Sequence, residues 1–332
     1  MRKSNKLIKL LILIGLISLI IFFCFLCTGA KNNKTSIGEY GFKGEGTYDY
    51  PYEIATWEDL VKFRDLVNSG IRFDFTYFIQ TNDIDLSNVE NWTPIGEYGS
   101  EKYFYGYYDG GGHTISNITC VNESGRVGFF GVLGGEVRNL GIDSGKFSGT
   151  HAGSIACQGS IDAVIFNCFN NATVCGTIRA GGIVDNYNGR VLFCINMGDV
   201  ESDGVIGGIS SWNAQINYCY STSYNPVSTD FLGQIKNSYK VDKSDLNLIF
   251  LQDMYDSLMR WDSGSVDTEN VTKITIQNSK MTFISRTFEV GDFRIEKNKM
   301  LFVLFLICFL VVVFLDFCIN VETKGTPKHE KG

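Results

Sequence analysis

Long apolar runs lie at both ends of the chain, and shorter strand-like patterns fill the middle. The first run, residues 7–27, is apolar apart from one lysine and one serine, and basic residues precede it. Small residues follow up to Ala30, which is the layout of a secretory signal with its cleavage site. The run is also long enough to span a bilayer uncut. We therefore expect residues 1–30 to be a signal peptide or an uncleaved signal anchor.

The second run, residues 300–321, predicts a transmembrane helix, with a buried core helix as the alternative. Its uncharged part has 16 residues, slightly short of a hydrocarbon layer of about 30 Å at a rise of 1.5 Å per residue. Asp316 lies near its end, where the carboxylate can reach the interface. The basic residues of the first segment place the N-terminus in the cytoplasm. The middle of the chain is then exported, and residues 322–332 form a cytoplasmic tail.

Helical periodicity appears once near the start of the exported part. Residues 31–50 are rich in Gly, Lys and Asn and predict a linker, and "ATWEDLVKFRDLVNSG" follows. Thr56 suits the N-cap and Asp59 stands at the capping-box spacing. Gly70 ends the pattern. The single apolar stripe consists of Leu60, Phe63 and Val67, so this helix must dock on another part of the protein.

Strand patterns then recur with a period near 26 residues. The segments "GFFG", "GSIA", "GGIV" and "GGIS" begin at Gly128, Gly153, Gly181 and Gly207. A period that holds two or three short strands and no helix predicts one coil of a parallel β-helix, whose coils stack about 4.8 Å apart. The glycines mark corners that need a positive φ or a close backbone approach.

Stacked coils place equivalent side chains above one another in internal ladders. We expect three ladders: Phe130, Ile155, Ile183 and Ile209; Val137, Ile165, Val191 and Ile216; and Leu140, Cys168, Cys194 and Cys219. The cysteines of the third ladder are expected to be buried thiols that pack as small hydrophobic groups.

Several motifs occur in a fixed order between residues 44 and 223. They are "GEGTYDYPYEIATWEDLVKFRDLVNSG", "YFIQTNDIDLSN", "WTPIG", "FYGYYDGGGHTISNI", "GFFGVLGGEVRNLGI" and the later "GGI" coils. This order resembles Glug-motif repeat proteins, which are bacterial surface proteins whose coils also form the non-catalytic stalk of some immunoglobulin-A proteases. The resemblance implies an all-β fold, a right-handed parallel β-helix (solenoid) with an N-terminal helical cap, over residues 51–230. It implies no activity, and the chain has no HExxH sequence.

Residues 231–299 lie outside this resemblance and predict an α+β C-terminal cap with a membrane-proximal spacer. Residues 244–261 have helical periodicity, and 271–290 alternate like a hairpin that turns at Asn278 and Ser279. The helix has Leu248, Leu251, Tyr255, Leu258 and Met259 mostly on one side. A cap is expected because an open last coil would expose an unpaired strand edge.

The net charge of −7 is unevenly distributed. The basic N-terminal segment contributes +4 and the residues from 316 onward are balanced, so the middle of the chain carries −11. This acidity disfavours nucleic acid and anionic lipid surfaces as partners, because both are polyanions.

The sequence "DGGGHTISN" places an aspartate four residues before a histidine, which suggests an Asp-oriented general base. The alternative is a glycine corner between two strands. In that case Asp109 accepts hydrogen bonds from turn amides, His113 faces solvent and Ile115 faces inward. The alternation around this segment favours the structural interpretation.

Two further acids, Asp83 and Asp85, share one face of a predicted strand. They are candidates for a weak calcium site, or for the paired acids of a sugar hydrolase, or for the solvated side of an edge coil. No cofactor is expected beyond this weak calcium site. The one CxxC, Cys24 to Cys27, lies inside the apolar N-terminal run, and no Cys-His cluster occurs, so a metal site of that kind is not expected. Cys157 and Cys175 are a candidate disulfide in an oxidising compartment.

The best candidate binding residues are the tyrosines of "EKYFYGYYDG". Alternation puts Tyr103, Tyr105 and Tyr107 outward, with Phe104 and Tyr108 on the opposite face. Outward tyrosines are a common platform for stacking sugar rings or protein partners. Ordinary strand composition also favours tyrosine, which is the alternative.

Taken together, the sequence predicts a cell-membrane protein whose exported β-helix of five or six coils binds a cell-surface glycan or protein without catalysis. Its terminal segments would contact the lipid bilayer. The alternatives are a polysaccharide lyase or glycoside hydrolase of the β-helix class, and a purely structural envelope protein.

Overall fold

The computed structural model describes residues 37–229, 231–260, 271–277 and 280–283. The predicted signal segment, membrane span and tail lie outside these residues. Within the described ranges, no helix combines the length and the apolarity that crossing a bilayer requires.

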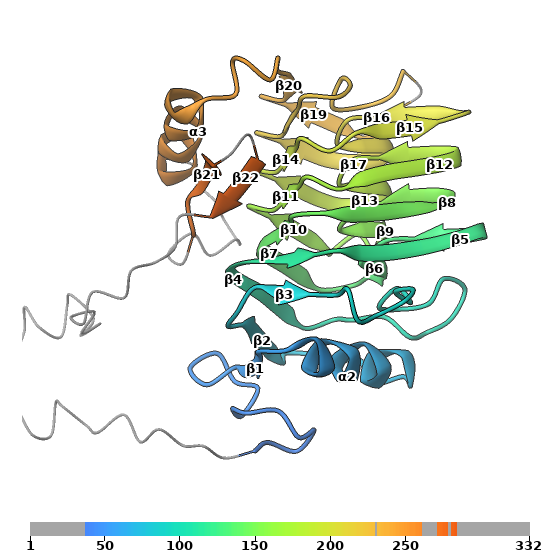
Figure 1. Ribbon diagram of the computed structural model, residues 1–332, viewed down its shortest axis with the longest axis vertical. Coiled ribbons are helices and arrows are strands. Elements are labelled where there is room, and N and C mark those ends of the chain that lie inside the picture. The colour runs from blue at the N-terminus through green and yellow to red at the C-terminus, as the bar shows by residue number, and fades with distance from the viewer. Residues whose placement is uncertain (1–36, 230, 261–270, 278–279, 284–332) are drawn as a thin grey trace, which may run out of the picture. The chain divides into compact units, whose positions relative to one another are not determined.

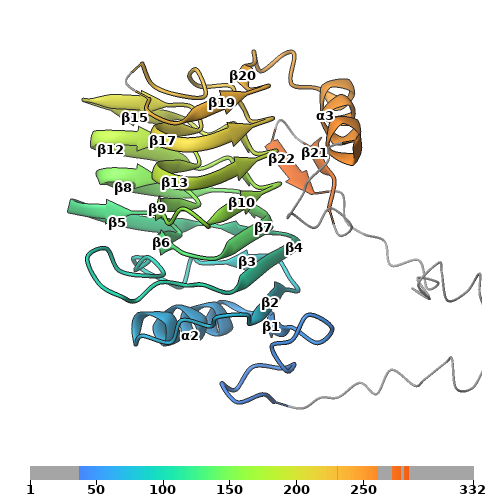
Figure 2. The ribbon, with the colours of Figure 1, turned by 180° about the vertical axis from the view of Figure 1, so that it is seen from behind.

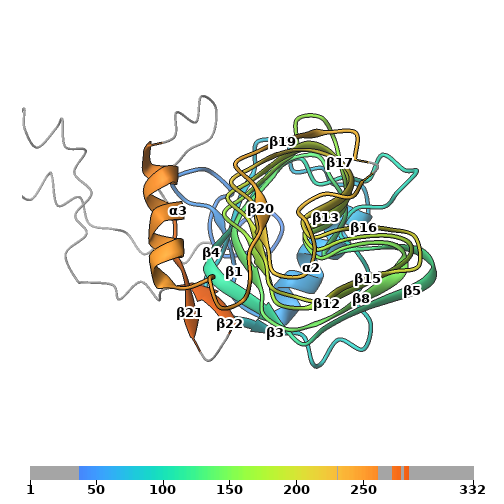
Figure 3. The same cartoon turned by 90° about the horizontal axis from the view of Figure 1, so that it is seen from above.

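Parallel strands stack into a mostly-β solenoid of about six turns (Figure 1). The main sheet contains β1 (Tyr52–Ile54), β2 (Tyr77–Gln80), β3 (Ile84–Asp85), β4 (Tyr107–Ser116), β6 (Phe130–Leu133), β7 (Glu136–Ile142), β9 (Ala156–Gly159), β10 (Val164–Phe166), β11 (Phe169–Asn170), β13 (Val184–Leu192), β14 (Ile195–Asn196), β17 (Ser210–Asn217), β18 (Tyr220–Ser221), β19 (Gln234–Lys236) and β20 (Tyr239–Lys240). The second sheet contains β5 (Ile118–Val127), β8 (Gly145–Gly153), β12 (Thr173–Gly181), β15 (Val200–Ser202) and β16 (Val205–Gly207). Figure 2 shows the same rows from behind, and Figure 3 shows the outlines of successive coils superposed.

The second predicted ladder is confirmed and continues in both directions. Val137, Ile165, Val191 and Ile216 pair in register through β7, β10, β13 and β17. The same register adds Tyr52, Phe78 and Tyr108 before them and Ile235 after them. All of these side chains except Ile235 are buried. The coil period therefore starts as far upstream as β1.

The first predicted ladder is displaced by one residue in its first coil. Phe130 pairs with Ala156, and the chain of pairs continues through Val184 to Ser210. The ladder consists of Phe129, Ile155, Ile183 and Ile209, all of them buried. Assigning Phe130 to it was wrong because this coil is one residue shorter at the corner: one residue separates Gly128 from Phe130, whereas two separate Gly153 from Ala156.

The third ladder, Leu140, Cys168, Cys194 and Cys219, is fully buried as predicted. The backbone amides of Cys168 and Cys194 each lie 3.5 Å from the sulfur of the cysteine in the next coil. Each ladder residue follows one with a left-handed backbone, namely Asn139, Asn167, Phe193 and Tyr218. Asparagine tolerates this conformation. The two aromatic residues stack their rings instead, with centroids 4.7 Å apart.

The corner glycines are required by close backbone approach and not by a positive φ. A Cβ added at Gly153 would lie 2.3 Å from the carbonyl oxygen of Ala156, and one at Gly181 would lie 1.8 Å from that of Val184. Neither glycine has a positive φ. Any side chain at these positions would therefore force the corner open.

Helix α2 (Trp57–Asn68) forms at the predicted place and buries the predicted face. The Thr56 hydroxyl accepts from the Asp59 amide at 3.3 Å, and Leu60, Phe63 and Val67 have no exposed surface. These three side chains belong to the same core as the ladders, and α2 lies beneath the coils in Figure 1. Phe42, inside the predicted linker, is buried against Tyr52 and Phe78, so that part of the linker contributes to the core.

The C-terminal elements pack against outward-facing side chains of several coils. The hairpin β21 (Ile274–Gln277) and β22 (Lys280–Phe283) is antiparallel as predicted, and Phe283 lies 5.0 Å from Phe169 between ring centroids. Phe250 of helix α3 (Leu248–Arg260) lies 4.9 Å from Tyr220. A second apolar cluster, separate from the interior, results. The predicted cap over the last coil is not confirmed, because β19 is exposed along its length.

Helix α3 differs from its prediction in start and buried face. Asn247 accepts from the amides of Ile249 and Phe250 at 3.0 and 3.1 Å, so the helix begins after this cap and not at residue 244. Among its described side chains, Leu251, Met254 and Leu258 are buried, and Met254 was not predicted. Tyr255 is half-buried beside them, and its ring lies 4.2 Å from the ammonium of Lys273.

Candidate functional site

The predicted outward tyrosines lie on the first coils, at and just before β4. Phe104 and Tyr108 are completely buried, whereas Tyr103, Tyr105 and Tyr107 are half-buried. The alternation is thus as expected from the sequence. Whether these rings bind a ligand stays a prediction.

Tyr107 stacks on a tyrosine of the preceding coil. Its ring lies 4.4 Å from that of Tyr77 with an interplanar angle of 8°, and Tyr48 meets Tyr77 edge-on at 5.5 Å. Burial, and then the neighbouring Tyr107, raises the pKa of Tyr77. Tyr77 was not among the residues predicted from the sequence. The match between "YFIQ" and "YYDG" in the coil register, which pairs Tyr77 with Tyr107, could have found it.

Tyr105 is held between an arginine and a glycine. The Arg72 guanidinium carbon lies 3.8 Å from the Tyr105 ring centroid, and Arg72 is oriented by hydrogen bonds to Asp74 at 3.1 and 3.2 Å. A Cβ at Gly134 would come within 2.7 Å of the ring, so this glycine makes room for it. Tyr103 lies 6.1 Å from Tyr105. Arg72 was not predicted as part of this site either, because no residue pattern near it in the sequence points to a contact with Tyr105.

We call Tyr48, Tyr77, Tyr103, Tyr105, Tyr107 and Arg72 the tyrosine face. Its rings are backed by the buried Phe104 and Tyr108, which belong to the continuous core. Partly exposed, pre-positioned rings can stack on the apolar face of a sugar while their hydroxyls hydrogen-bond. Their fixed orientation lowers the entropic cost of binding.

The hydrogen bonds found for Asp109 and His113 go to different partners. Asp109 accepts from the Gly111 amide at 2.8 Å and from the Asn139 side chain at 3.0 Å. Gly111 and Gly112 have positive φ, and Gly112 lies under Thr272. Asp109 thus accepts from a glycine amide and Ile115 is buried, as expected, but the predicted corner between two strands is wrong: the glycines form an irregularity within the single strand β4.

His113 instead contacts Asp83. Its Nδ1 lies 3.3 Å from Asp83, which also accepts from the Thr114 amide at 2.8 Å. The hydrogen bond from His113 is the main cause that lowers the pKa of Asp83. Asp85 accepts from the Asn117 side chain at 2.9 Å and from the Ser87 amide at 2.8 Å, and these bonds lower its pKa.

The two acids thus have separate donors. Across the part of the chain that the structure describes, no group of three or more His, Cys, Asp or Glu side chains could hold a metal ion. Calcium at Asp83 and Asp85 stays a prediction.

The candidate disulfide between Cys157 and Cys175 is wrong, since both thiols are free. Cys157 lies in β9 of the main sheet and contacts the His151 carbonyl at 3.5 Å, whereas Cys175 lies in β12 of the second sheet, 3.6 Å from Glu201. Their sheets hold the two thiols apart.

Alkylation by iodoacetamide at pH 8 is expected to modify Cys175 first among the six described cysteines. It is the one that is half-exposed, whereas burial raises the pKa of Cys168 and Cys194 and hides them. Burial and then Glu201 also raise the pKa of Cys175, so Glu201→Gln should speed its modification. Mass spectrometry of timed digests measures this. Equal rates at Cys175 and Cys194 in the folded protein would contradict the burial argument.

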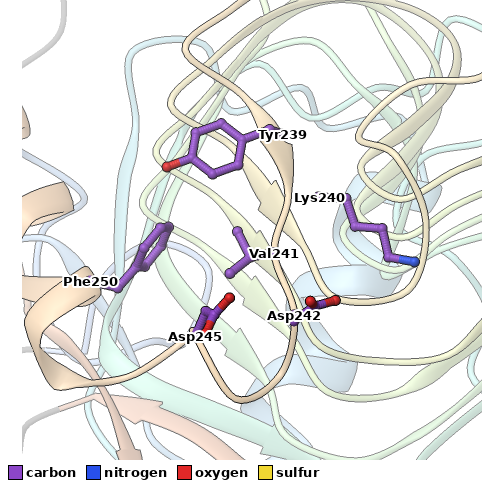
Figure 4. Close-up of a pocket in the computed structure, with 6 residues that line it drawn as sticks. All are labelled: Tyr239, Lys240, Val241, Asp242, Asp245 and Phe250. Carbon is purple, nitrogen blue, oxygen red and sulfur yellow. The ribbon is translucent and has the colours of Figure 1, made fainter.

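A hollow of about 420 Å³ lies between the last coil and the start of α3 (Figure 4). Tyr239 and Phe250 line it on one side, and Asp242 and Asp245 lie at the turn before the helix. The Asp242 carbonyl accepts from the Asp245 amide at 2.9 Å, so this turn has a structural role in leading the chain into α3.

Comparison with known proteins gives partial matches. No protein-family model matches the chain. It is 31% identical over 174 residues to halomucin of Haloquadratum walsbyi, covering 49% of this chain and 2% of that protein. It is 31% identical over 139 residues to a candidate Gly-rich membrane protein of Evansella cellulosilytica, covering 40% of this chain and 15% of that protein. The chain thus spans only a small part of the curated relatives it matches.

The chain also has partial similarity to a solved structure. It is the crystal structure of an immunoglobulin A1 protease candidate from Bacteroides ovatus, with a TM-score of 0.46 and 21% identity, over 60% of this chain and 77% of that one. The Glug-motif resemblance itself stays an expectation.

Proposed function

We propose that this protein is a cell-surface recognition protein that binds a glycan through the tyrosine face and does not act on it chemically. The observation that supports this most is the stack of Tyr77 and Tyr107, with Tyr48 edge-on, on the outer side of a rigid coil. Ladders of buried side chains beneath the rings fix their spacing, which suits a repeating ligand.

The surface location rests on the apolar terminal segments of the sequence and on the names of two relatives. One of these is described as a membrane protein, and the name of the other is halomucin. The acidic middle of the chain fits an exported domain that does not bind polyanions such as nucleic acid. Membrane anchoring through residues 300–321 is part of the proposal.

A polysaccharide lyase or hydrolase is the alternative. It would place acids opposite each other along a groove, whereas Asp83, Asp85 and Asp109 are each held by local donors. Incubating the full chain with a polysaccharide panel and measuring new chain ends separates the two functions. Their appearance would replace recognition by catalysis.

Replacing Tyr105 or Tyr107 by alanine is expected to weaken glycan binding about tenfold, because one stacking ring contributes on the order of 1–2 kcal/mol. The ligand is first identified on a glycan array with the full chain in detergent, and affinities are then measured by calorimetry. Tyr224→Ala is the matched control, since Tyr224 is also exposed and lies near Gly208, far along the coil stack. Equal losses at Tyr224 and Tyr107, or binding of a surface protein but no glycan, would overturn the assignment.

A further inference from the structure

A row of basic side chains crosses three successive coils on the second sheet. Arg126 in β5 pairs in register with His151 in β8, and His151 pairs with Arg179 in β12. Coil stacking places these residues about 4.8 Å apart. Each of the three side chains is half-buried. Such a row is unexpected in a chain with a net charge of −7.

One end of the row is neutralised by an internal acid. Arg179 donates to Asp185 from Nε at 2.8 Å and from Nη2 at 3.2 Å, and Asp185 is completely buried. Ser211 also donates to this carboxylate. Arg179 lies near the end of β12 and Asp185 near the start of β13, so the Gly181 corner brings their side chains together. Trp212 lies 4.9 Å from the Arg179 guanidinium.

The other end keeps its charge. The guanidinium of Arg126 lies 3.9 Å from the ring of Tyr98, and no acid pairs with it among the described residues. Its Nη1 is buried and has no hydrogen-bond partner there. A buried charged donor without an acceptor costs folding free energy. An oxyanion beside Arg126 would remove this cost.

Between the two arginines, His151 presents one free ring nitrogen. The Thr150 hydroxyl donates its proton to the Gly125 carbonyl at 2.8 Å, so at 3.0 Å from His151 it must accept from Nδ1–H. Nε2 therefore carries the lone pair of the neutral ring. Burial is the main cause that lowers the pKa of His151. The nearby Asp185 opposes this effect, and Arg126 and Arg179 add to it, so the ring is neutral at pH 7.

We propose that Arg126 and His151 form a binding site for the carboxylate of a uronic acid residue in the glycan. The planar guanidinium fits a carboxylate through two parallel hydrogen bonds. Protonated His151 would donate from Nε2 to the same group. Tyr98, which is more than half exposed, has to move aside from Arg126 and can then stack on the sugar ring.

This inference rests on the proposed glycan function and names its ligand class. Burial is the main cause that raises the pKa of Tyr103, and Tyr98 contributes to it, so Tyr98 lies near the tyrosine face. The acidity of the whole chain disfavours a polyuronate. At physiological salt, however, charges more than about 8 Å away are largely screened. A single carboxylate is therefore affected mainly by the cations next to it. The expected ligand is therefore a mostly neutral glycan with isolated uronic acids.

Binding should take up a proton. A carboxylate beside His151 raises the pKa of the imidazole from its lowered value. The other charged groups around the ring do not change this expectation, because Asp185 stays paired with Arg179 and Arg126 faces the ligand. Cys157 is a buried thiol and stays neutral. Affinity is then expected to rise as the pH falls from 7 to 5, where a uronate with a pKa of about 3.5 is still charged. Calorimetry in two buffers of different ionisation enthalpy measures this uptake.

The test uses the full chain in detergent and a xylo-oligosaccharide that carries one glucuronic acid, beside the same compound with that carboxylate reduced to an alcohol. The wild type should prefer the acid at least about tenfold, the contribution of one charge-assisted hydrogen bond. Arg126→Gln should abolish this preference, and His151→Gln should abolish the proton uptake. Arg64→Gln is the control. Arg64 lies on helix α2, and its guanidinium also stacks on an aromatic ring, that of Trp92. Thermal melts establish whether each variant is folded. If Arg126→Gln does not fold, Arg126→Lys, which keeps the charge, serves as the second variant.

The outcomes separate this inference from the function it rests on. Equal affinity for the acid and its reduced form, or a preference that survives Arg126→Gln, overturns the carboxylate site and leaves glycan recognition standing. In another outcome, Arg126→Gln abolishes the preference for the acid, whereas Tyr105→Ala and Tyr107→Ala keep it. This result supports the carboxylate site and removes the tyrosine face from the function. Binding of neither compound overturns both.

Discussion

Replacing Phe63 by alanine is expected to destabilise the protein by about 3–5 kcal/mol, the range for truncating a buried phenylalanine. Phe63 has no exposed surface, and its ring lies 4.7 Å from Phe78, 5.0 Å from Phe104 and 5.6 Å from Tyr108 between centroids. The cavity would open where α2 meets the first coils, and the rigid strands around it cannot collapse to fill it. Urea unfolding followed by circular dichroism measures the loss.

The loss should depend on the size of the residue and on its burial. Phe63→Leu should cost much less than Phe63→Ala, because it keeps most of the volume. Glu58→Gln, at an exposed position of the same helix, should change the free energy of unfolding by less than about 0.5 kcal/mol. If Phe63→Ala costs no more than Glu58→Gln, then α2 does not stabilise the first coils.

Much of the coil interior could be predicted because one physical rule repeats in it. Ile165, Val191 and Ile216 recur at the coil period, since each must fill the same place one coil further along. The error at Phe130 has the same origin. A repeat read from spacing assumes corners of equal length, and the corner at Gly128 is one residue shorter. Pairing between strands, which the sequence does not contain, corrects the alignment.

The outer surface was harder to predict because it depends on contacts between segments far apart in the chain. Nothing near Tyr105 in sequence indicates that Arg72 covers its ring. Likewise, Val164 and Phe166 look like ordinary strand residues. They are buried in the outer apolar cluster, to which side chains of helix α3 and of the hairpin also belong. The row of Arg126, His151 and Arg179 becomes visible only when the coils are placed in register.

Asp185→Asn is expected to cost about 3–5 kcal/mol, the range for removing one partner of a buried ion pair. The substitution keeps the shape of the side chain and an oxygen that can accept from Ser211. It removes the charge that faces the Arg179 guanidinium at 2.8 Å. Arg179 is then left 14% exposed with an uncompensated charge. Because the pair joins strands on either side of the Gly181 corner, the loss should appear as lower global stability in urea unfolding.

The stability lost in Asp185→Asn comes from the unpaired charge of Arg179 and not from the loss of the aspartate alone. A double variant tests this. Arg179→Gln combined with Asp185→Asn removes both charges and should recover a large part of the stability that Asp185→Asn loses, giving a coupling free energy of more than about 1 kcal/mol. Arg64→Gln, which leaves only the exposed carboxylate of Asp65 without its partner, should cost far less. If the two substitutions at Arg179 and Asp185 were additive, the ion pair would contribute nothing beyond its separate side chains. The corner would then be stabilised by backbone packing at Gly181 alone.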